Sequence, residues 1–302
     1  MRNRCWRPLE PEPGNAGEGK GITGYSERLS SSPEREVKMD VYGLLEKVRD
    51  KKPLVHHLTN WVTIYDCANI VKVFGASPVM AHAPEEVADM SNLADALVLN
   101  IGTLTLDFIE SMKIAIASAN KKGIPVILDV CGAGATPFRN QKVSELLKSG
   151  KISVIKGNAS EIASTAGVNV QTKGVDAVDV SHGLKEIAKN LAKKQSCTVV
   201  ITGKDDIVSD GEKVFIVSNG SQMLSHVVGT GCMATSVIGT FSCVCEYYAE
   251  ASAAALCCFG IASEFAAIKS CGPGSFKENL YDAVFHLNRK QIEERAKIKI
   301  EK

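Results

Sequence analysis

The sequence lacks three features, and each absence excludes a class of function. It has almost no net charge, +1 from 35 basic and 34 acidic residues, so no long-range field attracts nucleic acid or an anionic membrane. None of its 10 cysteines are spaced as Cys-x-x-Cys, which argues against a zinc site or a disulfide framework and favours a reducing cytoplasm. Its longest apolar stretch, residues 251–263, is too short to cross a bilayer, and its small residues indicate close helix packing in a core. Any anionic partner must therefore be bound by a local site.

The composition of the chain changes after residue 38. Residues 1–38 contain several prolines and glycines, a triple serine and little that forms a packed face, so we expect a disordered leader. Its acidic residues argue against a transit peptide, and it has no apolar segment typical of secretion. In a chain that is 45% hydrophobic, residues 39–302 are enough for one domain with a large core.

The rest of the chain alternates short β-branched runs with helical segments. This alternation predicts an α/β fold with three layers, in which helices cover both faces of a mostly parallel sheet. The expected strands are residues 54–58, 78–81, 96–101, 125–129, 152–156 and 197–202. Helices are expected between them, for example at 106–122 and 184–194, and a hairpin around Asp210-Gly211 adds antiparallel strands at one edge. Three helical segments are expected to finish the chain.

Polar residues gather where the predicted strands end. Asp129, Lys156 and Thr202 each end a strand, and residues 132–134 form a glycine loop directly after one of them. Ligands of such sheets bind beyond the carboxyl ends of the strands, so these groups are expected to converge on one edge.

A second glycine loop precedes a predicted helix near residue 230. Gly229, Thr230 and Gly231 lead into Cys232, and small and apolar residues then recur at helical spacing up to residue 244. Unpaired amide hydrogens and the helix dipole make such a start an anion site, with the cysteine facing what reacts there. The alternative is ordinary turn chemistry with Cys232 as a small core residue.

Asp129, Asn158 and Glu161 offer oxygen ligands suited to a magnesium ion that touches substrate phosphates. Asn158 and Glu161 also have the spacing of a helix capping box, and Asp129 alone reads equally as a turn aspartate. Lys156 is either a phosphate clamp or a solvated strand end. Together with the anion loop these residues indicate phosphoryl transfer, with Cys232 as the base that accepts the proton of an alcohol. The helix start would lower the pKa of the thiol, while a neighbouring triphosphate would raise it.

Over roughly residues 53–285 the chain resembles the hydroxyethylthiazole kinases of the ribokinase-like superfamily. The motifs that carry the resemblance are VHHLTN (55–60), GASPVMAHAPEEVADM (75–90), ALVLNIGTLT (96–105), GAGATPFR (132–139), GNASEIA (157–163), GTGCM (229–233) and GPGSF (272–276).

The resemblance implies ATP-dependent phosphorylation of 4-methyl-5-(2-hydroxyethyl)thiazole, with magnesium, as a salvage step toward thiamine. It also implies a homotrimer whose substrate pockets lie at subunit contacts. Its implied residues fall into four groups: Asn60, Met80 and Gly229 at the thiazole, Lys156 and Thr202 at ATP, Asp129 and Glu161 at magnesium, and Cys232 as the base. Taken without the family, Met80 and Asn60 would read as a core methionine and a turn asparagine.

Three positions depart from the pattern of the family. Lys156 stands where members often have arginine, Val228 replaces a common threonine, and Val130-Cys131 replaces a usual Pro-Val, which is expected to loosen the turn after Asp129. Two alternatives stay open: a kinase for another small heterocyclic alcohol or sugar, and an ATP-dependent dehydratase on the same fold. Met80, with an apolar neighbourhood, favours a flat, weakly polar ring over a sugar, because a sugar pocket needs several fixed polar partners.

Overall fold

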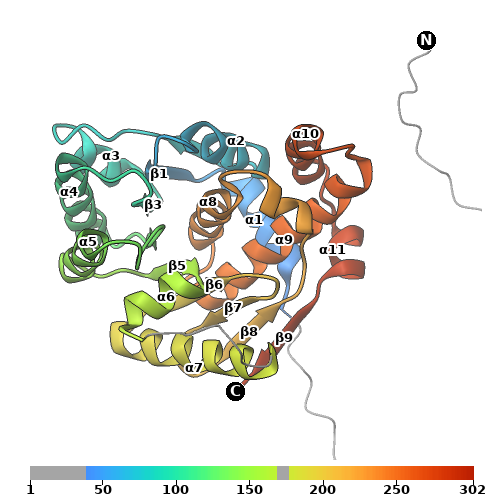
Figure 1. The fold of residues 1–302 in the computed structure, drawn as a ribbon. Coiled ribbons are helices and arrows are strands. Elements are labelled where there is room, and N and C mark those ends of the chain that lie inside the picture. The colour runs from blue at the N-terminus through green and yellow to red at the C-terminus, as the bar shows by residue number, and fades with distance from the viewer. Residues whose placement is uncertain (1–38, 169–176) are drawn as a thin grey trace, which may run out of the picture. The chain divides into compact units, whose positions relative to one another are not determined.

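A nine-stranded sheet organises the protein (Figure 1). The computed structural model describes residues 39–168 and 177–302, so the expected leader, residues 1–38, lies outside the described residues. The strands are β1 (Leu54–Leu58), β2 (Ser77–Val79), β3 (Ala96–Asn100), β4 (Val126–Asp129), β5 (Val154–Asn158), β6 (Thr198–Thr202), β7 (Asp206–Ser209), β8 (Val214–Val217) and β9 (Ile298–Glu301). They lie in the order β2-β1-β3-β4-β5-β6-β7-β8-β9.

The first six of these strands run parallel and the last three pair antiparallel. The six predicted parallel strands and the hairpin of β7 and β8 are confirmed, with ends that differ by one or two residues. Each parallel crossover places its helix on one face of the sheet, which is why the two faces are both covered.

Helices α1 (Val41–Lys51), α2 (Ile64–Phe74), α8 (Thr230–Ser242), α9 (Tyr248–Lys269), α10 (Pro273–Phe285) and α11 (Arg289–Arg295) contribute to the core on one face of the sheet. The opposite face is covered by α3 (Val87–Leu93), α4 (Leu106–Lys122), α5 (Pro137–Lys148), α6 (Ala159–Ala166) and α7 (Ala177–Gln195). The side chains of β3 alternate between the two cores: Val98 packs into the first, and its neighbours Leu97 and Leu99 pack into the second. The predicted three-layer architecture is confirmed.

Local sequence explains where helix α4 begins and ends. The Thr105 side chain caps its start by accepting a hydrogen bond from the Phe108 N–H at 3.3 Å, and Gly123 ends it with a left-handed backbone, φ 82°. The predicted bounds, 106–122, are confirmed.

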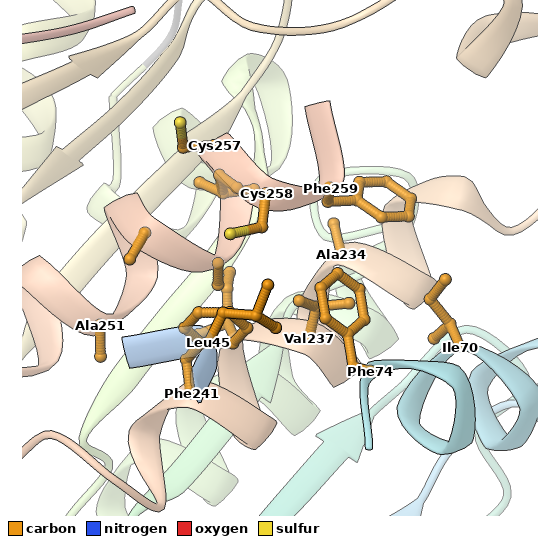
Figure 2. Packing of buried hydrophobic residues seen from close by; sticks show 14 of the residues in the cluster. Leu45, Ile70, Phe74, Ala234, Val237, Phe241, Ala251, Cys257, Cys258 and Phe259 are labelled. Carbon is orange, nitrogen blue, oxygen red and sulfur yellow. The ribbon is translucent and has the colours of Figure 1, made fainter. Parts of the chain in front are cut away.

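Helix α9 is the buried centre of the larger core. It is the one described helix whose length and mean hydropathy would suffice to cross a membrane, yet 78% of its apolar window is buried inside the fold. Figure 2 shows Cys258 and Phe259 of this helix on the side of α8, α2 and α1, whereas Cys257 points away from them and its thiol donates to Asn219 Oδ1 at 3.3 Å. On another side of the helix, Gly260 allows close approach to the segment after β8, since a Cβ there would lie 2.5 Å from the Asn219 carbonyl oxygen. The expectation of close packing inside the core is confirmed.

The end of the chain differs from the prediction. Four α-helices, not three, follow the hairpin, and the last described element is strand β9, which pairs antiparallel with β8. The short run Ile298–Glu301 carries two charged residues among four, so its own sequence gave little strand preference. It becomes a strand because it pairs with the open edge of β8.

Candidate active site

The parallel strands bring distant polar residues to one edge of the sheet. Asn100 at the end of β3 pairs in register with Asp129 at the end of β4, which pairs in turn with Lys156 on β5. Asn158 at the end of β5 pairs with Thr202 at the end of β6. The expected convergence at the carboxyl ends is therefore set by strand register.

The second glycine loop forms the amino end of α8. Gly229 caps the helix with φ 92°, a conformation that favours glycine, and a Cβ there would overlap the side chain of Thr63. Thr230 Oγ1 donates to the Leu224 carbonyl at 2.9 Å and so fixes the loop to the preceding turn. The first N–H groups of a helix have no partner within it, so the loop presents amide donors and the positive end of the helix dipole.

A buried ion pair lies beside this loop. Lys156 Nζ is 3.3 Å from Asp129 Oδ2, and the Thr235 hydroxyl donates to the same oxygen at 2.6 Å. Burial lowers the pKa of Lys156, but the combined attraction of Asp129, Cys232 and Glu161 outweighs it and the pKa is raised. A Cβ on Gly231 would lie 3.3 Å from Lys156 Nζ, which places the ammonium group next to the anion loop. Lys156 is thus a buried cation, not a solvated strand end.

Cys232 lies on the first turn of α8, where its sulfur meets two carboxamides. Asn60 Nδ2 donates to the sulfur at 3.2 Å and Asn100 Nδ2 donates at 3.3 Å. We call these two groups around the sulfur the amide cradle. The cysteine is therefore placed among polar partners at the strand edge, not in the apolar core.

The surroundings of Cys232 favour its thiolate form. The pKa of Cys232 is lowered to about 6, chiefly by a hydrogen bond from the Cys131 thiol and further by Thr63 and Lys156, against burial and the charge of Asp129. The same interaction and burial raise the pKa of Cys131. Cys131, expected only to loosen a turn, therefore also affects the pKa of the candidate base.

Asn158 and Glu161 form the capping box that their spacing allowed. Asn158 Oδ1 accepts from the Glu161 N–H at 3.0 Å, and Glu161 Oε2 accepts from the Asn158 N–H at 2.7 Å. Glu161 Oε1 also accepts from the Gly132 N–H at 2.7 Å, which joins the first glycine loop to α6. These contacts occupy one lone pair on each carboxylate oxygen, and a carboxylate has further acceptor sites.

A cavity of about 710 Å³ opens between the first glycine loop and α6. Its lining includes Gly132, Gly134, Asn158 and Glu161. This is within the size range of small-molecule sites. Within residues 39–168 and 177–302, no group of three or more His, Cys, Asp or Glu residues could hold a metal ion.

Two predicted site residues lie further from the sulfur. Thr202 Oγ1 donates to the Gly157 carbonyl at 3.4 Å, at the edge next to Asn158. Met80 is half-buried directly after β2, and His56 Nε2 fixes this loop by donating to the Ala81 carbonyl at 2.8 Å. Among the described hydrogen bonds and ion pairs, neither residue contacts Cys232.

Sequence reasoning missed three further residues of the site. Asn100 contacts Cys232, and Thr235 contacts Asp129. Arg139 donates to three backbone carbonyls in the loops after β3 and β4, those of Ile101 at 2.8 Å, Cys131 at 3.0 Å and Gly102 at 2.8 Å. Asn100 ends an apolar strand, the same pattern that pointed to Asp129, and could have been found in this way. Thr235 and Arg139 carry no comparable pattern.

Comparison with known proteins gives consistent matches. A model of the hydroxyethylthiazole kinase family matches residues 45–290. A hydroxyethylthiazole kinase of Methanosarcina mazei is 54% identical over 254 residues, which cover 84% of this chain and 97% of that protein. The solved structure of a hydroxyethylthiazole kinase protein from Pyrococcus horikoshii OT3 has a TM-score of 0.81 at 40% identity, covering 87% of this chain and 99% of that one. The structure of a ribokinase-like superfamily protein from Enterococcus faecalis V583 has a TM-score of 0.55 at 12% identity. The match covers 76% of this chain and 86% of that chain, and it shows that the two proteins share a fold.

Proposed function

The chain belongs to the hydroxyethylthiazole kinase family, and from this premise we propose that it transfers the γ-phosphoryl group of ATP to 4-methyl-5-(2-hydroxyethyl)thiazole. The product is the thiazole phosphate, and the reaction is a salvage step toward thiamine. One observation carries the mechanism: a sulfur with a lowered pKa lies at the amino end of a helix, beside a buried ammonium group.

Cys232 is the proposed general base. Its lowered pKa favours the thiolate form, which is able to accept the proton of the acceptor hydroxyl. The amide hydrogens of Thr230 and Gly231 and the ammonium group of Lys156 would stabilise the negative charge on the transferring phosphoryl group. The bound phosphates would raise the pKa of the thiol again, so the base is moderate, and positioning supplies most of the rate.

ATP is proposed to lie along the strand edge from Lys156 toward Asn158 and Thr202. The buried ammonium of Lys156 would contact the phosphates as a point charge, without the two-pronged contact of an arginine. Asn158 is exposed and lines the 710 Å³ cavity, and Thr202 pairs with it on the next strand.

The residues present fit a magnesium ion. Asp129 Oδ1 is buried without a hydrogen-bond partner, so this oxygen is free for a cation or a water molecule bound to one. Glu161 would add an oxygen from the first turn of α6. A site with few protein ligands suits Mg²⁺, which keeps several waters and binds through substrate phosphates. When bound, the ion would neutralise phosphate charge.

The thiazole pocket is proposed to involve Met80, Asn60 and Gly229. All polar side-chain atoms of Asn60 already bond to other protein groups, so it would border the ring without donating to it. Met80 would supply apolar contact for a flat ring.

We infer a homotrimer with substrate pockets at subunit contacts. Three exposed large side chains support a subunit contact next to the pocket: Trp61, Val62 and Tyr65 are 46%, 68% and 73% exposed and lie shortly after Asn60 in the chain. Light scattering combined with size exclusion would measure the assembly. We also infer a cytoplasmic location, since nine cysteines of the described residues are free thiols.

A coupled assay of ADP release tests the proposed reaction and base. The purified protein is given ATP, Mg²⁺ and a panel of alcohols that includes the thiazole, a pyrimidine alcohol and a sugar, and the product is identified by mass spectrometry. Cys232→Ala is expected to reduce kcat by about 100-fold or more while ATP binding stays unchanged, and Cys232→Asp is expected to keep turnover. Cys271→Ala is the matched control, because Cys271 is an exposed free thiol.

The panel also separates the alternatives. Phosphorylation of another alcohol in preference to the thiazole would overturn the proposed substrate. ATP-dependent dehydration of a hydrated nicotinamide cofactor without a thiazole phosphate would replace the kinase by a dehydratase. Full activity of Cys232→Ala would refute the base.

A further inference from the structure

The orientation of the Asn100 side chain is determined by a backbone group. Asn100 Oδ1 accepts the Gly102 N–H at 2.9 Å, and a backbone N–H can only donate. The carboxamide therefore cannot be flipped without losing that bond. Its amino group must face Cys232 Sγ, at 3.3 Å.

Asn60 is fixed by the same logic. Its Oδ1 accepts from both the N–H and the hydroxyl of Thr63, at 3.2 and 3.1 Å. Its amino group is thereby left to donate to Asn100 Oδ1 at 3.0 Å and to Cys232 Sγ at 3.2 Å. The two carboxamides thus form one connected cradle.

The cradle determines which state of the sulfur fits. An amino group of a carboxamide has no acceptor, so the sulfur of Cys232 must accept both bonds, and a thiolate accepts better than a thiol. Asn60 and Asn100 are only 4% and 1% exposed, so little water competes for these bonds. Both donors are neutral amino groups. They stabilise the anion without adding a second positive charge that would compete with Lys156 for the phosphates.

We propose that Asn100 is a positioning residue for the transfer step, which holds the Cys232 sulfur as a thiolate directed at the acceptor hydroxyl. The proposal rests on the proposed function and adds a residue to it. In the step, the O–H bond of the alcohol breaks and its proton forms the S–H bond. The alcohol oxygen bonds to the γ-phosphorus, and ADP leaves with the electron pair of the broken P–O bond.

Other groups act on the same sulfur and must stay unchanged in a test. Lys156 from β5 and the thiol of Cys131 favour the anion, while Asp129 from β4 opposes it. From α2 and its cap, Thr63 supports the anion and the neighbouring Cys67 interacts with its charge. A substitution at Asn100 alters none of these residues.

The test measures the alkylation of Cys232 by iodoacetamide as a function of pH, without substrates, by mass spectrometry of its peptide. In Asn100→Asp an oxygen with negative charge replaces the donor, and the midpoint of alkylation is expected to rise by about one to two pH units. Asn100→Leu removes the donor without adding charge and is expected to give a smaller rise in the same direction. Asn120→Asp is the matched control, because this carboxamide bridges only the backbone of Lys151.

Kinase assays on the same variants follow the pH dependence of kcat. At pH 7 the kcat of Asn100→Asp is expected to fall roughly two- to tenfold from the loss of thiolate, and to recover toward the wild-type value at pH 9, with KM values little changed. A merely structural role would lower kcat at every pH and leave the alkylation midpoint unchanged.

The outcomes separate the two proposals. A wild-type alkylation midpoint in either folded Asn100 variant refutes the role of Asn100, and Asn100→Leu decides if Asn100→Asp does not fold. A raised midpoint in a protein that never phosphorylates the thiazole refutes the proposed function and leaves the action of Asn100 on the sulfur standing.

Discussion

The buried ion pair between Lys156 and Asp129 offers the sharpest test of how this site is built. The lysine side chain is 5% exposed and the aspartate side chain 1%, with 3.3 Å between Nζ and Oδ2. Two unit charges at that distance attract by about 5 kcal/mol at an effective dielectric constant of about 20. Lys156→Met therefore leaves a buried carboxylate uncompensated, and Asp129→Asn leaves a buried ammonium uncompensated.

Each single substitution is expected to lower the free energy of unfolding by about 3–5 kcal/mol. The double variant removes both charges at similar volume, so it should lose less than the sum of the single losses. We expect a coupling energy of about 2–4 kcal/mol. Thr235 still donates to Oδ2 in Lys156→Met, which limits the loss in that variant.

Urea unfolding without ATP or magnesium measures these values, because neither ligand then contributes to the stability. Lys290→Met is the control: Lys290 is 82% exposed and 4.0 Å from Glu294, and its removal should leave the unfolding midpoint unchanged. Single losses below about 1 kcal/mol, or strictly additive losses, would refute the claim that the pair is buried and mutually dependent.

Three further predictions follow from contacts described above. Glu161→Gln should raise the Mg²⁺ concentration needed for half-maximal activity, measured by titration of the ion; an unchanged requirement would count against Glu161 as a ligand. Gly229→Ala should lower stability by about 2–4 kcal/mol, because of its positive φ and the overlap with Thr63, whereas helical Gly231→Ala should cost less; thermal melts that rank them in reverse would contradict this. Burial raises the pKa of Asp206 to about 7, so the folded protein binds more protons than the unfolded chain above about pH 4, and stability should fall as pH rises to about 7. Asp206→Asn should remove that decline from a series of thermal melts, and an identical decline in the variant would exclude Asp206 as its cause.

Much of the fold could be predicted because its information is local. Most parallel strands are short apolar runs, and helix α4 carries its own cap and stop at Thr105 and Gly123. Strand β9 could not be predicted in this way, since Ile298–Glu301 depends on the edge of β8, some eighty residues earlier.

The candidate site also contains residues that could be predicted from local sequence and contacts that could not. Asp129 and Lys156 could be found because each ends a strand, and their ion pair follows from strand register. The hydrogen bonds to Cys232 could not be predicted from the sequence, because they require α8 to place its first turn against β3 and the loop after β4. Asn100 lies 132 residues from Cys232 in the sequence, and no local sequence pattern predicts that the two residues are in contact. The assigned roles of these residues remain predictions until the assays above are made.

The sulfur of Cys232, hydrogen-bonded at the helix start, has a consequence beyond its proposed catalytic role. Peroxide attacks thiolates far faster than thiols, and the first product, a sulfenic acid, no longer accepts a proton as a base. A carboxylate in the same position would be inert to such oxidants. With Cys232 as the proposed base and a second thiol at Cys131 close to it, oxidation of this sulfur would be expected to stop the proposed transfer.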